Sequence, residues 1–98
     1  MRSTATIATE NARRYMIQLC KHFGHRVTAT FNDKEGRIAF ETGEVHLRAA
    51  PRTLMLLADA AQPDLLERLE TVIDSHLKRF AFREPDLAVE WRRAPAEA

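Results

Sequence analysis

Hydrophobic residues recur at a helical period in two stretches of the chain, and these stretches predict two amphipathic helices. The first runs from Thr9 to Arg26, and the second runs from Pro63 to Phe80. In both, apolar side chains follow the i, i+3, i+4, i+7 spacing that gathers them on one face of a helix. The two apolar stripes are Ala12, Tyr15, Met16, Leu19 and Phe23, and then Leu65, Leu66, Leu69, Val72, Ile73, His76, Leu77 and Phe80.

The expected ends of the helices carry residues that suit those positions. Thr9 lies where an N-cap belongs, because its hydroxyl can accept a hydrogen bond from an unpaired N–H of the first turn. Gly24 lies where many helices end in a left-handed residue, a conformation that costs glycine little. Pro63 suits a first helical position, where the missing N–H has no intrahelical partner to lose.

Outside the helices the hydrophobic period changes to two, which is typical of half-buried strands. Alternating apolar and polar residues predict strands over residues 3–8, 27–31, 37–41, 44–49, 54–58 and 87–92. Short links rich in turn residues join the second to the fifth of these segments, so we expect the four strands to form an antiparallel meander. Residues 93–98 are expected to be a frayed tail.

The predicted order of elements is β-α-β-β-β-β-α-β, which indicates an α+β fold. Two amphipathic helices and one mostly antiparallel sheet form a two-layer sandwich when both helices pack on one face of the sheet. A chain of 98 residues fits one domain, residues 1–98, with an ordered core over about residues 3–92.

The sheet face away from the helices is expected to be polar, but Met55 and Leu57 fall on it. Two interpretations remain open at this point. An exposed apolar patch among polar residues is typical of an interface, here that of a homodimer. Isolated apolar residues are also ordinary on protein surfaces and need no function.

Composition narrows the class of protein. The net charge is +1 and both signs are spread along the chain, which argues against a nucleic-acid or anionic-membrane surface. The chain has one cysteine, and its first residues lack the apolar core of a secretory signal. No apolar run approaches the length of a membrane span. We therefore expect a cytoplasmic protein with no membrane or nucleic-acid partner.

Four residues are candidates for ligand binding: His76, Cys20, His22 and Arg79. Cys20 and His22 point to opposite flanks of a helix, so the two should not share one ion while both remain helical. If His76 meets either residue across the helix pair, a site for zinc or iron becomes geometrically possible. His76 is otherwise a neutral core histidine whose nitrogens bond the Tyr15 hydroxyl or a backbone carbonyl.

Enzymatic chemistry has the least support from the residues. A nucleophilic pair of Cys20 and His76 needs a lowered thiol pKa, but Cys20 lies near a helix C-terminus, where the helix dipole disfavours a thiolate. Arg79 fits either a small anion site or an ion pair, for example with Glu84. The chain has no glycine-rich phosphate loop, zinc-finger spacing or serine-hydrolase elbow.

Two sequence blocks resemble a small bacterial domain-of-unknown-function family, family twenty-two eighteen. The first block holds Arg14-Tyr15 and Leu19-Cys20-Lys21-His22-Phe23, followed by His25, and the second runs from His76 to Glu84. The resemblance extends from about Thr4 to Trp91. It implies no established activity and defines no catalytic residues, but it implies an association with siderophore-interacting flavin reductases and other iron-uptake proteins.

Two hypotheses follow from the sequence. In the first, the chain is a small cytosolic binding or accessory domain linked to iron or siderophore handling, with candidates at the boundary between the two helices. In the second, it is an interaction domain without a small ligand that forms a homodimer around Met55 and Leu57.

Overall fold

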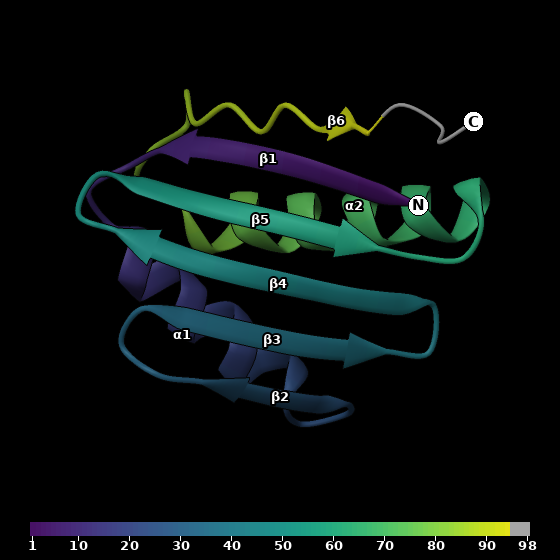
Figure 1. Cartoon of the computed structure of the whole chain (residues 1–98). Helices are drawn as coiled ribbons and strands as arrows, with labels where there is room; N and C mark the ends of the chain where they lie inside the picture. The colour runs from purple at the N-terminus through teal and green to yellow at the C-terminus, as the bar shows by residue number, and fades with distance from the viewer. Residues whose placement is uncertain (95–98) are drawn as a thin grey trace.

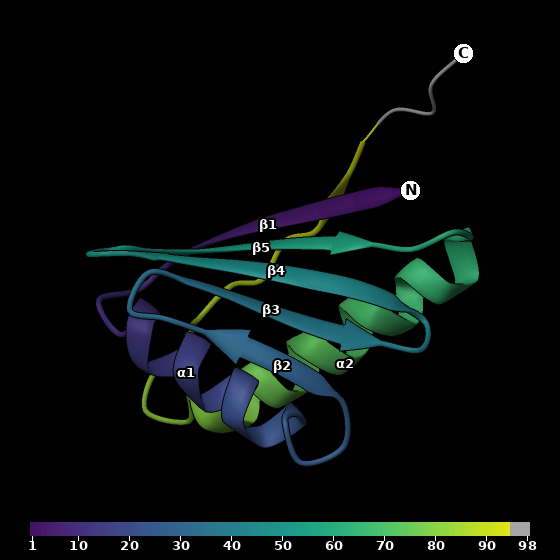
Figure 2. The ribbon, with the colours of Figure 1, turned by 60° about the horizontal axis from the view of Figure 1, so that its bottom comes forward.

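The computed structural model describes residues 1–94, and within them one six-stranded sheet carries both helices (Figure 1). The elements are β1 (Arg2–Ala8), α1 (Ala12–Phe23), β2 (Thr28–Phe31), β3 (Glu35–Phe40), β4 (Gly43–Ala50), β5 (Thr53–Asp59), α2 (Pro63–Phe80) and β6 (Arg92–Arg93). Both helices lie on the same side of the sheet (Figure 2). The predicted α+β class and the order of its elements are confirmed. No helix in this part of the chain is long and apolar enough to cross a membrane.

The sheet is antiparallel throughout, with strand order β2-β3-β4-β5-β1-β6. Strands β2 to β5 form the meander that short turns predict. The first strand then pairs with the last strand of the meander, from Arg2 opposite Asp59 to Ala8 opposite Thr53. The chain enters α1 soon after β1, and α1 packs mainly beneath β2, β3 and β4 (Figure 2).

The core fills the space between the sheet and the two helices. Strand β1 shows the pattern most clearly, because its residues alternate strictly between exposed and buried. Alternation at period two in the strands and 3.6 in the helices directs one apolar face of each element into this layer. The largest fully buried side chains are Ile7, Met16, Leu19, Ile38, Leu54, Leu56, Leu66, Leu69, Ile73 and Leu77.

Gly43 begins β4 in a backbone conformation that other residues rarely adopt, with φ of 150°. A Cβ atom there would collide with the carbonyl oxygen of Asp59 on the neighbouring strand. It would also lie 2.9 Å from Cδ1 of Leu69 in α2. Glycine therefore lets the turn before β4 approach both β5 and the helix layer.

The predicted N-cap of α1 is wrong, and Gly24 ends the helix as predicted but without the left-handed conformation expected of it. Helix α1 begins at Ala12, so Thr9 precedes the helix by too many residues to cap it. The Thr9 hydroxyl instead accepts a hydrogen bond from the Asn11 N–H at 3.1 Å. Gly24 has φ of −62°, a right-handed conformation, because its N–H continues the helical bonding to the Cys20 carbonyl at 2.9 Å.

The last strand is shorter and later than predicted. Only Arg92 and Arg93 form β6, opposite Thr4 and Ser3 of β1. The segment from 87 to 91 does alternate between half-buried and exposed residues, but it forms no backbone ladder there. Its apolar side chains pack against the core without strand pairing, which explains why the pattern predicts a strand. The predicted tail therefore starts within β6, and residues 95–98 lie outside the described residues.

Candidate functional site

The two sequence blocks meet where α1 and α2 pass each other beneath the sheet. His22 of the first block lies beside His76 of the second. Tyr15 of the first block likewise donates a hydrogen bond to Glu84 of the second. Each contact thus joins one residue of the first block to one residue of the second, and the two contacts lie at separate places in the structure. We name the first group, His22, Phe23, His76 and Phe80, the histidine seam.

The histidine seam is a cluster of aromatic rings in tilted and edge-to-face contacts. The ring centres of His22 and His76 are 4.9 Å apart, with the ring planes tilted by 45°. Phe23 lies 4.8 Å from His76, and Phe80 lies 5.6 Å from His22. Phe40 of β3 packs 5.0 Å from Phe23, which connects the cluster to the sheet. The structure therefore brings together two of the four predicted ligand candidates.

Hydrogen bonding assigns the proton on His76. Its Nδ1 lies 2.7 Å from the Val72 carbonyl oxygen and 3.4 Å from the Ser75 hydroxyl. Because a carbonyl only accepts, the shorter contact places the proton on Nδ1 and leaves a lone pair on Nε2. Of the two partners that the sequence left open for His76, the backbone carbonyl is therefore the one observed. The Tyr15 hydroxyl bonds Glu84 instead.

His22 lies in a positively charged environment. It is an exposed residue in the last turn of α1. Desolvation by neighbouring atoms lowers the pKa of its imidazole, and the charges of His76, Arg79, His25 and Arg26 lower it further. Arg79 therefore acts on the seam through its charge, and its own side chain is exposed.

Cys20 faces the sheet. It is 1% exposed, and its Sγ is so close to Gly36 of β3 that a Cβ there would lie 2.8 Å from the sulfur. Burial raises the pKa of the Cys20 thiol to about 11, so the group is a neutral thiol at neutral pH. In residues 1–94 no group of three or more His, Cys, Asp and Glu side chains is arranged to hold a metal ion.

Glu84 is the centre of a polar network that the sequence did not reveal. Its carboxylate accepts hydrogen bonds from the Tyr15 hydroxyl, from the Thr9 hydroxyl at 2.9 Å and from the Asn11 amide at 3.3 Å. The hydrogen bond from Tyr15 is the main reason that the pKa of Glu84 is lowered. The pKa of Tyr15 is raised, mainly by burial and next by its contact with Glu84. We name these four residues the Glu84 clasp.

The only sequence signal for the clasp was the Tyr15 hydroxyl, which lies in the apolar stripe of the first helix. Thr9 and Tyr15 are both buried, and a buried hydroxyl needs a partner. That partner lies 75 residues from Thr9 along the chain, in the loop that follows α2. The expected ion pair between Arg79 and Glu84 is absent among the ion pairs of residues 1–94.

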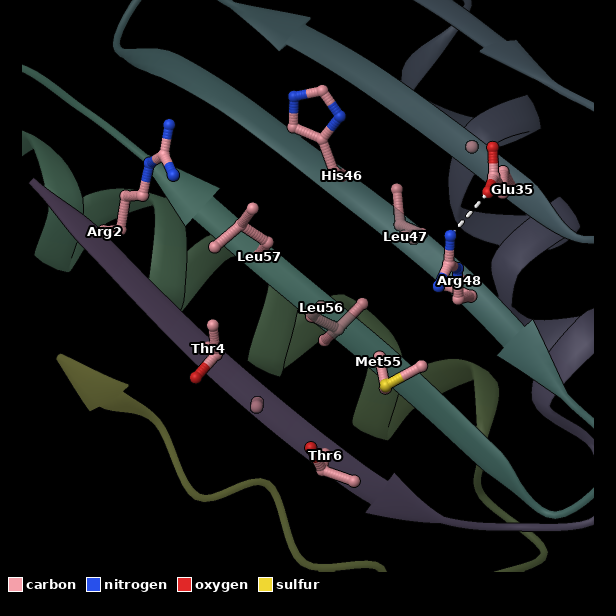
Figure 3. A pocket seen from close by; sticks show the side chains of 12 residues that line it. Arg2, Thr4, Thr6, Glu35, His46, Leu47, Arg48, Met55, Leu56 and Leu57 are labelled. Carbon is pink, nitrogen blue, oxygen red and sulfur yellow. Dashed lines mark hydrogen bonds and ion pairs between the residues drawn. The ribbon is translucent and has the colours of Figure 1, made fainter. Parts of the chain in front are cut away.

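Within residues 1–94, no helix lies over the opposite side of the sheet, which forms a second candidate surface (Figure 3). Strand pairing sets its side chains in rows, so that Met55 lies between Thr6 and Arg48, and Leu57 lies between Thr4 and His46. Met55 is 37% exposed, and Leu57 is half-buried. A shallow groove of about 740 Å³ follows these rows. We name this surface the open sheet face; its residues are Arg2, Thr4, Thr6, Glu35, Arg37, Glu44, His46, Arg48, Met55, Leu57 and Asp59.

Charged groups on the open sheet face neutralise one another. Three arginines are paired with three carboxylates: Arg2 with Asp59 at 3.3 Å, Arg48 with Glu35 at 2.9 Å, and Arg37 with Glu44. His46 Nε2 also lies 3.3 Å from Glu44. The hydrogen bond from Arg37 is the main cause of the lowered pKa of Glu44. The face is therefore close to neutral, with an apolar centre.

Comparison with known proteins identifies relatives without an assigned activity. The family model DUF2218, described as an uncharacterized protein conserved in bacteria, matches residues 4–92. A solved structure, the NMR structure of PA4090 from Pseudomonas aeruginosa, is similar with a TM-score of 0.80 and 34% sequence identity. The match covers 99% of this chain and 98% of that one. No curated protein matches the chain. The family match over nearly the whole chain shows that this protein belongs to DUF2218, an uncharacterized family conserved in bacteria.

Proposed function

We propose that this domain is a non-catalytic interaction module that binds a second copy of itself through the open sheet face. The observation that carries the proposal is the pair of apolar side chains, Met55 and Leu57, at the centre of a sheet face that no other element of the described chain covers. Apolar area exposed inside a polar rim is typical of protein interfaces.

The charge arrangement supports self-association. A two-fold interface brings the same patch of both partners together, so the patch must be complementary to itself in shape and charge. The ion pairs formed by Arg2, Arg37 and Arg48 leave the face near neutrality. Two copies therefore approach without the repulsion that a face of one sign would produce.

The size of the face sets the expected strength. Five strands spaced about 4.8 Å apart, each about seven residues long at about 3.3 Å per residue, span about 550 Å² before side-chain relief is counted. A stable interface buries about 800 Å² on each partner. The open sheet face therefore suits a weak to moderate homodimer, in which packing of sheet on sheet buries Met55 and Leu57.

Analytical ultracentrifugation tests the proposal with one disruptive and one control variant. We expect wild-type protein to shift from monomer to dimer as its concentration rises, and Met55→Lys to stay monomeric because it adds a second cation beside Arg48 in the dry centre of the contact. Phe82→Lys is the control, since Phe82 is 70% exposed but lies in the turn after α2. Wild-type protein that stays monomeric at every concentration, or Met55→Lys that dimerises normally, contradicts the proposal.

A second candidate role follows from the family resemblance, which implies iron-uptake proteins and siderophore-interacting flavin reductases as partners. We propose the cytoplasm as its setting, since the single cysteine, Cys20, is a buried free thiol. The same ultracentrifugation experiment with a purified flavin reductase tests this role. Formation of a mixed complex that Met55→Lys removes supports it, and sedimentation of the two proteins as separate species contradicts it.

A further inference from the structure

We propose that His22 and His76 together bind one divalent transition-metal ion of the class that favours imidazole nitrogen, represented by Zn²⁺ and Cu²⁺. The site is in the histidine seam, on the helix side of the sheet, so it does not depend on association through the open sheet face. Two protein nitrogens leave the remaining coordination positions for water or for a small ligand that arrives with the ion.

The spacing of the two rings agrees with a shared ion. Zinc–nitrogen bonds are about 2.0–2.1 Å long, so two imidazoles on one tetrahedral ion have ring centres about 5 Å apart. The ring centres of His22 and His76 are 4.9 Å apart. Both side chains stand on helices that are held against the same sheet, so the fold fixes the spacing between the two helices.

His76 has the hydrogen bonding of a metal ligand. Histidine ligands usually donate the second ring N–H to a carbonyl or carboxylate, which fixes both the ring and its tautomer. The Val72 carbonyl accepts this bond from Nδ1 at 2.7 Å, so the Nε2 lone pair is available. Within residues 1–94, neither Nε2 of His76 nor either ring nitrogen of His22 has a hydrogen-bond partner.

The surroundings favour His22 and His76 over a random pair of surface histidines, yet they limit the affinity. Phe23 and Phe80 pack against the imidazole rings and exclude water from part of the site. Arg79 contributes a positive charge at His22, which opposes a divalent cation. Removal of that charge should therefore tighten metal binding, whereas removal of either imidazole should weaken it.

Calorimetric titration of Zn²⁺ into the complete chain, purified without a histidine tag, tests the proposal. We expect one Zn²⁺ per chain, and affinity at least about tenfold weaker in His22→Ala and in His76→Gln. Arg79→Gln should bind Zn²⁺ about two- to fivefold more tightly than wild type. The lower value applies when salt screens the repulsion between Arg79 and the ion, and the higher value applies at low salt. His46→Ala is the matched control, because His46 lies on the open sheet face and its loss should leave the affinity unchanged.

Two further measurements keep the result interpretable. Circular dichroism establishes that each variant is folded, and the exposed position of His22 makes His22→Ala the variant least able to disturb the core. Broadening of NMR signals by Cu²⁺ locates the ion independently, with signals at the histidine seam expected to disappear first. Absence of Zn²⁺ binding in the wild-type chain, equal affinity in both seam variants and wild type, or loss of binding in His46→Ala overturns the proposal.

Discussion

Removal of the Glu84 carboxylate is expected to destabilise the whole domain. Glu84→Ala leaves the Thr9 and Tyr15 hydroxyls without their acceptor, although both residues are buried. A hydrogen bond to a charged group contributes about 1.5–3 kcal/mol, and the partly exposed position of Glu84 favours the lower end of this range. The bond from the exposed Asn11 should add little. The expected loss in the free energy of unfolding is therefore about 3 kcal/mol.

Urea unfolding monitored by circular dichroism measures this loss, and a double-mutant cycle assigns it. Tyr15→Phe removes one donor and should cost about 1.5 kcal/mol, with a coupling to Glu84→Ala of about 1 kcal/mol or more. Glu90→Ala, which alters an exposed carboxylate between α2 and β6, should change stability by less than about 0.5 kcal/mol. If Glu84→Ala costs no more than Glu90→Ala, or if the coupling is zero, the clasp does not contribute to stability.

Acid should remove the contribution of the clasp in a defined direction. The folded-state pKa of Glu84 lies below its ordinary value, so its contribution is complete above the unfolded-state pKa of about 4.3 and is lost as the pH falls through the lower, folded-state value. Wild type and Glu84→Gln should therefore converge in stability in acid. At alkaline pH the raised pKa of Tyr15 gives the opposite sign, and its contribution is lost as the pH rises through the folded-state value.

Two other variants test separate features of the fold. Gly43→Ala should destabilise the domain by about 3 kcal/mol or more, because the new Cβ meets the Asp59 carbonyl in a backbone conformation that is strained for alanine. Unfolding of Gly43→Ala in urea measures this loss, and a cost below about 1 kcal/mol contradicts the strain. Cys20 should react with iodoacetamide at neutral pH only as fast as the domain opens, because the thiol is buried and its pKa is about 11; rapid labelling without denaturant would contradict this placement.

Local patterns predicted the elements of this fold because each pattern reports one face of one segment. The alternation in β1, the stripe of α1 that contains Leu19 and the stripe of α2 that contains Ile73 could each be read without knowledge of the neighbouring elements. The segment from 87 to 91 shows the limit of this reasoning. Its alternating burial is present, but backbone pairing there requires a free strand edge at the correct distance, and the sequence pattern does not contain that information.

The candidate site was less predictable because it depends on how two helices pack. His76 was identified from its own position in an apolar stripe, but its proximity to His22 follows from the register between α1 and α2. The same register separates Cys20 from the seam and turns it toward Gly36 of β3. The hydrogen-bonding role of Glu84 was not predicted because its partners are far away in the chain. The most distant of them, Thr9, lies 75 residues earlier, and a local pattern does not extend that far.

The two proposals occupy opposite sides of the sheet, and this separation gives them different relations to the sequence blocks. Tyr15, His22, His76 and Glu84 belong to the blocks that carry the resemblance, and all four lie on the helix side. Tyr15 and Glu84 already have a structural role, since their bond ties the start of α1 to the loop after α2. The imidazoles of His22 and His76 have no hydrogen bond to each other, so the seam is where block residues keep ring nitrogens without a partner among residues 1–94.

Met55 is outside both blocks, on the open sheet face, opposite the two helices. A partner bound to the open sheet face therefore does not contact the block residues, and a metal ion at the histidine seam does not contact Met55. Because the sheet stands between the two surfaces, failure of Met55→Lys to prevent dimerisation would leave the zinc titration unaffected. Loss of zinc binding in His22→Ala would likewise leave the monomer–dimer equilibrium unchanged, so each surface can be refuted without reference to the other.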